Sequence, residues 1–354
     1  MKRIRFFDVV RVICFIAIIY YHMIAQLPIN GICSNEAVWP WVANANMQLG
    51  TFAVAVFFMI SGASLMYTTR DKLELGMFYL KRYIRLLIPF YVVTFMYYIV
   101  NAIRVRDLAG VYTGGIPVWR WIFTILGIDE WVSMHGVVTF SRGIGEWFLG
   151  ALVILSLLFP LLRYLMLKNQ KIFIAAATVL YLFVVFHYNS NIPIFMGLPV
   201  KGFDFVIGMW YGLNWQKISP KWKYVSIPIV ILYFICPIQF PINDAIKIWI
   251  LAFAFLVSFS FFEDKLQKCN IKGINWLSKY SYELYLVHHL VIYAMTPYQP
   301  GYAYGMVDYA KLFIKELIVI FVIAIVAKFI SDKLIKCIWK ILNSIQCKRT
   351  GKEV

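Results

Sequence analysis

Residues 8–27 read DVVRVICFIAIIYYHMIAQL, an apolar run of spanning length that holds one arginine, Arg11, and one histidine, His22. Eleven residues make about three helical turns, so both side chains project from one face, with a rise of roughly 16 Å between them. Ionisable side chains inside a membrane span cost free energy and are retained mainly where they have a function. This stretch therefore predicts a membrane fold and a functional face on its first helix.

The composition places the whole chain in the same class. Of 354 residues, 62% are hydrophobic, 18% are aromatic and only 14% are charged, which is typical of a polytopic membrane protein. The basic head, residues 1–7, resembles the start of a signal peptide, but no small-residue cleavage pattern follows, so we expect a retained helix. We predict an all-α transmembrane bundle of about ten helices, at 8–27, 47–67, 86–102, 146–163, 172–187, 203–216, 225–240, 245–262, 276–296 and 311–335.

The distribution of basic residues predicts the topology. With the N-terminus inside, the inner segments hold 25 of the 34 Lys and Arg residues and the outer segments hold 8. Cytoplasmic segments are enriched in Lys and Arg, so both termini are expected in the cytoplasm. The net charge of +17 thus gathers at span ends, and we expect membrane lipids, not nucleic acid, as partners. A single transmembrane domain at 1–340 is followed by a basic tail at 341–354.

One connection does not fit a simple hairpin. Residues 103–145 form a long outer segment, and its apolar stretch 118–128 is short for a membrane span. A re-entrant or interfacial helix over the bundle fits better, and such an element is suited to line an acceptor site. The alternative, a spanning helix, would invert every later segment and remove the charge asymmetry.

Ionisable residues on the first helix suggest acid–base chemistry. His22 is a candidate general base, because neutral imidazole accepts protons near physiological pH; the alternative is a core histidine bonded to a backbone carbonyl. Asp8 lies three residues before Arg11 on the same face, where an ion pair would orient the guanidinium. In the second helix, Ser61 and Gly62 permit close approach of a ligand or, as the alternative, of another helix.

Two further helix ends carry candidate binding residues. Arg82 and Arg85 share a face at the inner membrane edge, where they can hold phosphates or act as ordinary positive-inside anchors. Glu146 stands at a helix start, where the helix dipole alone would stabilise it. The neighbouring Trp147 is either an interfacial belt residue or a stacking platform for a sugar ring.

The ninth predicted helix holds Glu283, which is buried if the span is correct and then needs a partner. Adjacent His288 and His289 project about 100° apart on a helix, so we expect them not to ligate one metal together. The six cysteines are scattered and form no CxxC pair, which supports neither a disulfide framework nor a metal site. No metal is predicted.

Taken in order along the chain, these motifs resemble the acyltransferase 3 family of integral membrane acyltransferases. The matches are Arg-ten residues-His (Arg11, His22), Phe-Phe-x-x-Ser-Gly (Phe57 to Gly62), Phe-x-x-x-Arg-x-x-Arg-x-x-x-Pro (Phe78 to Pro89), Trp-Phe-Leu ending in Pro (Trp147 to Pro160) and Ser-Tyr-x-x-Tyr-Leu-Val-His (Ser281 to His288). Each motif is weak alone, but five in sequence are specific. Many family members have His before the Trp, where this chain has Glu146.

The resemblance implies a ten-helix domain that takes an acyl group, usually acetyl, from cytoplasmic acyl-CoA. The acceptor it implies is a hydroxyl of a cell-surface polysaccharide or lipid-linked saccharide, at the cytoplasmic membrane of a bacterium. It also implies that His22 is the catalytic base and that Arg11 is essential. Arg82 and Arg85 are then expected at the coenzyme A phosphates.

The remaining roles are expectations that follow from these motifs. We assign Asp8, Arg11 and Glu146 to catalysis beside His22. Arg11 and Ser61 are also expected at the cofactor, beside Arg82 and Arg85. The substrate residues that we expect are Trp147, Glu283 and His288. Four points stay open: the identity of the acceptor, the acyl group (acetyl, succinyl or another), direct transfer or an acyl-histidine intermediate, and monomer or homodimer. The main alternative function is a glycolipid transporter or flippase, which predicts inverted repeats or matched broken helices that this sequence does not show.

Overall fold

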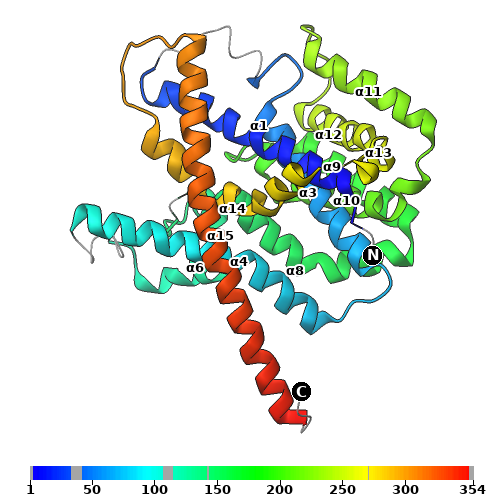
Figure 1. Ribbon diagram of the computed structural model, residues 1–354. Coiled ribbons are helices and arrows are strands. Elements are labelled where there is room, and N and C mark those ends of the chain that lie inside the picture. The colour runs from blue at the N-terminus through cyan, green and yellow to red at the C-terminus, as the bar shows by residue number, and fades with distance from the viewer. Residues whose placement is uncertain (1–2, 33–41, 107–114, 142, 270, 351–354) are drawn as a thin grey trace.

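The computed structural model describes residues 3–32, 42–106, 115–141, 143–269 and 271–350, without the side chains of residue 105 and of 346–350. It confirms the all-α membrane class, because the described residues contain no β-strand and each of the ten predicted spans overlaps an α-helix over most of its length (Figure 1). These helices are α1 (Arg5–Ile29), α3 (Leu49–Thr69), α4 (Leu75–Val105), α8 (Glu146–Lys168), α9 (Gln170–His187), α10 (Leu198–Asn214), α11 (Pro220–Ile235), α12 (Asp244–Ser260), α14 (Lys272–Met295) and α15 (Met306–Thr350).

Length and hydropathy separate these helices into two groups. Helices α1, α3, α4, α8 and α9 are long and apolar enough to cross a membrane by themselves. Helices α10, α11 and α12 have 17, 16 and 17 residues, so spanning requires local thinning of the bilayer. A charged or polar minority of residues lowers the mean hydropathy of α14 and α15, which pack against each other and against α1.

Two predicted boundaries are wrong by many residues. Helix α4 begins at Leu75 and not at residue 86, and α15 continues through residue 350 and not 335. Hydropathy detects only the apolar part of a helix, whereas backbone hydrogen bonding continues into charged ends. The expected tail at 341–354 is therefore helical through residue 350, and α15 extends away from the other helices at its C-terminal end (Figure 1).

Glycines hold α3 and α10 in close contact. A Cβ atom added at Gly208 would lie 2.0 Å from the carbonyl oxygen of Met59, and one added at Gly62 would lie 2.1 Å from that of Phe205. Gly212 makes the same kind of contact one turn further along α10, which completes a GxxxG packing face. Gly62 thus serves helix packing, and α3 becomes a fixed wall for the rest of the bundle.

The outer connection forms no spanning helix in its described part, residues 115–141. Its apolar stretch folds into a 3₁₀ turn, η1 (Val118–Arg120), and the six-residue helix α6 (Trp121–Leu126), followed by α7 (Asp129–Met134). Six residues rise only about 9 Å, so the prediction that 118–128 does not span is confirmed. Helix α7 packs against α8 where Gly150 leaves room for Trp131: a Cβ at Gly150 would lie 2.4 Å from that of Trp131.

The remaining short elements join the long helices. They are η2 (Ile194–Met196), η3 (Trp215–Lys217) and α13 (Glu263–Lys268). The four cysteines whose side chains are described, Cys14, Cys236, Cys269 and Cys337, are free thiols, and the predictions for Cys33 and Cys347 fall outside the described side chains.

Candidate active site

A cavity of about 550 Å³ opens between α1, α3, α7, α8, η2 and α14. His22 of α1, Glu146 and Trp147 of α8, and His289 of α14 line it. Trp147 stacks on Phe58 with 6.3 Å between the ring centroids, so its indole is fixed on the cavity wall. The outer connection adds Glu130, Ser133 and Met134 of α7 to the lining, one turn beyond the stretch for which this role was predicted.

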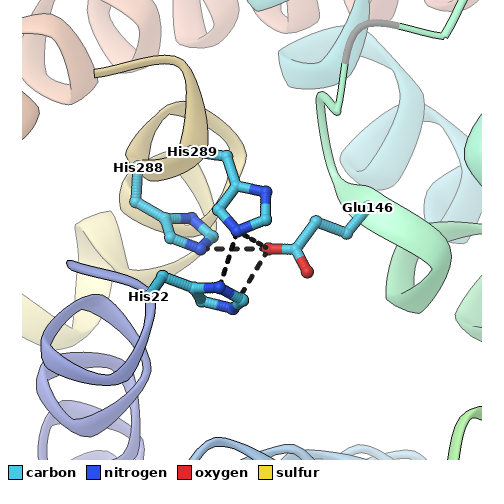
Figure 2. A group of neighbouring side chains, drawn as sticks. All are labelled: His22, Glu146, His288 and His289. Atoms are coloured by element: carbon cyan, nitrogen blue, oxygen red, sulfur yellow. Dashed lines mark hydrogen bonds and ion pairs between the residues drawn. The ribbon is translucent and has the colours of Figure 1, made fainter. Parts of the chain in front are cut away.

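Four ionisable side chains from three helices converge at this cavity (Figure 2). The Oε1 atom of Glu146 lies 3.0 Å from Nε2 of His288, 3.4 Å from Nε2 of His289 and 3.6 Å from Nε2 of His22. The Nε2 atom of His289 is also 2.7 Å from Nδ1 of His22, a hydrogen-bond distance. One carboxylate oxygen therefore has an imidazole of each histidine as its neighbour.

His288 lies behind the cavity wall, and only 1% of its side chain is exposed. Its Nδ1 atom lies 2.5 Å from the carbonyl oxygen of Tyr285. A carbonyl oxygen can only accept, so Nδ1 carries a proton and donates it. The Nε2 atom then faces Glu146, and within the described structure neither this nitrogen nor Oε1 of Glu146 has a partner of hydrogen-bond geometry.

The backbone at Glu146 is held in an unusual conformation. Glu146 has φ +45° and Gly145 has φ +73°, a left-handed region that a residue with a Cβ enters only at a cost in free energy. The hydroxyl of Tyr285 donates to the carbonyl oxygen of Gly145 over 2.8 Å. Such strain persists where the surroundings fix it, and it is frequent at functional sites.

Asp8 forms the ion pair with Arg11 that was expected from their spacing, with 3.1 Å between Oδ1 and Nη1. The same buried carboxylate accepts from Nε of Arg3 over 2.6 Å and from the hydroxyl of Ser278 over 2.8 Å. The other terminal nitrogen of Arg11 donates to Ser64 of α3 over 2.9 Å. Arg11 thus joins α1 to α3, and Asp8 joins α1 to α14.

A second cavity, of about 410 Å³, lies at the end of α3 and the beginning of α4. Arg82 and Arg85 line it together, as their shared helical face predicts, with Lys72 and Lys81 beside them. The Nε atom of Arg82 donates to Ser156 over 3.0 Å, while its Nη2 atom is buried with no hydrogen-bond partner in the described residues. A buried guanidinium nitrogen without an acceptor is suited to receive an anionic oxygen.

One face of α3 runs from the first cavity to the second. Val54 lines the histidine cavity, and Leu65 and Thr68 line the basic cavity. Ser61 lies between them on the same face, seven residues from Val54 and seven from Thr68. It lines neither cavity. From Val54 to Leu65 the helix rises roughly 16 Å, which sets the separation of the two sites along α3.

Glu283 has a partner away from both cavities. Its buried carboxylate lies 3.4 Å from Nζ of Lys328 on α15, and Glu283 is absent from the linings of both cavities. This contact indicates that Glu283 pairs α14 with α15. His288, also expected to bind substrate, meets Glu146 instead.

The side chains of His288 and His289 converge, although their spacing led us to expect that they do not ligate one metal together. Their Cβ atoms leave the helix in different directions, but both Nε2 atoms come within 3.4 Å of Oε1 of Glu146. The side-chain torsions of each histidine turn its ring toward the same point. His289 was therefore missed as a site residue, and its position beside His288 was the available signal. Glu130 was missed too, since its surroundings depend on the packing of α7.

A family model described as an acyltransferase domain matches residues 4–331 of the chain. That range includes every residue of both cavities. No curated protein and no solved structure matches the chain.

Proposed function

The chain belongs to the acyltransferase 3 family, and from that premise we propose that this membrane acyltransferase moves an acetyl group from acetyl-CoA to a hydroxyl of a cell-surface polysaccharide or lipid-linked saccharide. The single observation that supports this most is the convergence of His22 with Glu146 on a cavity large enough for a sugar. The proposed location is the cytoplasmic membrane of a bacterium, with both termini inside.

The donor binds from the cytoplasm at the basic cavity. The phosphates of coenzyme A meet Arg82 and Arg85, and the Nη2 atom of Arg82, buried without an acceptor, supplies one of the charge-assisted hydrogen bonds. Lys72 and Lys81 add positive charge at the rim. Glu74 lines the same cavity and pairs with Lys72 over 2.6 Å. Arg82, Arg85 and Lys81 have no carboxylate partner among the described residues, which favours phosphate binding over anchoring alone.

The pantetheine arm then follows α3 toward the histidine cavity. It passes Ser61, which lies on the same face of α3 as Val54 and Thr68. Arg11, held by Asp8 and Ser64, fixes α1 against α3 along this route. The thioester reaches the cavity where His22 stands.

Transfer begins when the acceptor hydroxyl gives its proton to His22. The oxygen forms a new bond to the thioester carbon, the carbon–sulfur bond breaks, and the leaving thiolate takes the proton from the imidazolium. Glu146, 3.6 Å from His22, stabilises that imidazolium while it exists. Trp147 offers a flat apolar face to the sugar ring. An acyl-histidine intermediate is the alternative route with the same products.

The test uses purified protein in lipid vesicles with radiolabelled acetyl-CoA and candidate glycans. The expected product carries the label, gains the mass of one acetyl group by mass spectrometry and forms only when both substrates are present. A glycolipid that crosses the vesicle membrane without any gain in mass would overturn the enzyme and favour a transporter.

A further inference from the structure

We propose that Glu146, His288 and His289 form a binding site for a divalent cation of the zinc class, with an open position that faces the cavity beside His22. The sequence contains no recognisable ligand motif, because one ligand comes from α8 and two come from α14. The fold alone brings them together (Figure 2).

The protonation of His288 is the first argument. Its Nδ1 proton is committed to the carbonyl of Tyr285, so in a neutral ring Nε2 presents a lone pair. That lone pair faces a carboxylate oxygen at 3.0 Å, and two buried acceptors at this distance repel each other. A cation between them removes the repulsion and offsets the buried negative charge of Glu146.

The spacing of the ligand atoms is the second argument. Zinc binds imidazole nitrogen at about 2.0–2.1 Å and carboxylate oxygen at about 2.0–2.2 Å, so neighbouring ligand atoms of a tetrahedral site lie about 3.3–3.5 Å apart. The Nε2 atom of His289 lies 3.4 Å from Oε1 of Glu146, within this range, and the Nε2 atom of His288 lies 3.0 Å from it, somewhat closer than a bound ion requires. Two imidazoles and one carboxylate are also a ligand set that catalytic zinc sites use.

The support around the ligands is the third argument. Metal-bound histidines usually donate their other ring N–H to a carbonyl or carboxylate, which fixes the ring. His288 does so to Tyr285, and the hydroxyl of Tyr285 also holds the carbonyl before Glu146. One residue therefore orients a ligand on each of two helices.

His22 is assigned a place outside the ligand set. Its Nδ1 atom lies 2.7 Å from Nε2 of His289, which is a hydrogen-bond distance and is too short for two ligands of one tetrahedral ion. The Nε2 atom of His289 has a single lone pair, so a bound cation would replace its hydrogen bond with His22. His22 is also the most accessible of the three histidines, with 22% of its side chain exposed. It thus stands where a group bound at the open position would arrive.

The metal site rests on geometry, whereas its use rests on the function proposed above. An acceptor hydroxyl in the open position would become more acidic, because a bound divalent cation stabilises the alkoxide. His22 would then take the proton. The cation would supply the activation that a lone imidazole gives only in part.

Metal content measures the site without any assay of transfer. The protein is purified in detergent, incubated with zinc, freed of excess metal and analysed by inductively coupled plasma mass spectrometry. We expect about one zinc per chain in the wild type, and close to none in Glu146→Gln, His288→Ala and His289→Ala. His22→Ala and the control His187→Ala, an exposed histidine at the end of α9, should retain the wild-type content. Size-exclusion elution and binding of acetyl-CoA show that each variant is folded.

Three results would overturn the proposal. The first is the absence of zinc from the wild-type protein. That result would indicate that Glu146 and the histidines share protons and do not bind a metal. The second is wild-type zinc content in Glu146→Gln and His288→Ala. The third is loss of zinc in His22→Ala, which would indicate a closed site of four ligands. Zinc binding without acetyl transfer would refute the proposed function alone, and full transfer by metal-free protein would refute only the role of the metal.

Discussion

The hydroxyl of Tyr285 donates a 2.8 Å hydrogen bond to the carbonyl oxygen of Gly145, and this bond ties the middle of α14 to the first turn of α8. The two histidines follow Tyr285 by one turn and Glu146 follows Gly145 directly. This buried contact therefore helps to fix the position of the imidazoles relative to the carboxylate.

Replacing that tyrosine tests the dependence. Tyr285→Phe should lower transfer by about 10- to 100-fold, the usual effect of removing an outer-shell partner, and lower the free energy of unfolding by about 1–3 kcal/mol. Transfer rate and thermal melting are measured together. Tyr211→Phe is the matched control, since Tyr211 is buried and donates to the carbonyl of Leu256 far from the site; a similar loss of transfer there would contradict the positioning role.

His22→Ala should abolish the proposed base. General base catalysis typically contributes about 10²- to 10⁴-fold, so the rate of acetyl transfer should fall by at least about 100-fold while expression and acetyl-CoA binding stay unchanged. The label incorporated into glycan is the measurement, with His187→Ala as control. Product at the wild-type rate would refute the assignment.

Arg82→Met should weaken binding of the acyl donor without slowing the transfer step. A charge-assisted hydrogen bond contributes about 1.5–3 kcal/mol, so the KM for acetyl-CoA should rise at least about tenfold with kcat little changed. The variant should also lose preference for acetyl-CoA over its 3′-dephospho analogue if it meets that phosphate. Lys171→Met, at an exposed cation of α9, should leave KM unchanged. An equal effect there would indicate only general attraction.

Asp129 on α7 predicts a dependence of stability on pH. Burial raises the pKa of this carboxyl to about 6, so the folded state holds its proton more tightly than the unfolded chain does. Ionisation therefore destabilises the fold as pH rises from about 4 to about 6, and the full penalty, roughly 2–3 kcal/mol, is present above that range. Asp129→Asn should melt at a higher temperature than wild type at pH 8 and at nearly the same temperature at pH 4. The exposed Asp264→Asn is the control, and an advantage of Asp129→Asn that is independent of pH would contradict this account.

Gly208→Ala tests the packing of α3 on α10. The new Cβ would lie 2.0 Å from a backbone oxygen, so the helices must separate at a cost of about 1–3 kcal/mol or more. Melting temperature and folded yield should both fall. Gly273→Ala, where the added Cβ meets nothing within 4 Å, should be neutral or slightly stabilising because alanine favours helix by about 1 kcal/mol.

Much of the fold was predictable because membrane helices need long apolar segments, and each such segment became a helix. The Asp8–Arg11 ion pair and the position of Arg82 and Arg85 on one helical face were predictable for a similar reason. In both, the partners lie three residues apart on one helix, where geometry is local.

The arrangement of the site was not predictable in the same way. Glu146, His22 and His289 belong to three helices, and their distances depend on interhelical packing and on the positive φ angle of Glu146. The pairing of Glu283 with Lys328 joins residues 45 positions apart. Helical phase predicts the direction in which a Cβ atom points. The contacts of a long side chain also depend on which residues of the neighbouring helix lie within its reach.

If the donor binds its phosphates at the basic cavity as proposed, the distance of roughly 16 Å along α3 to the histidine cavity sets how long the donor must be to reach His22. A small activated acetyl compound such as acetyl phosphate, anchored by the same arginines, would stop well short of His22. Only a molecule whose reactive carbon sits at the end of a long flexible tether can satisfy both ends, so this enzyme would select its donor by reach as well as by charge.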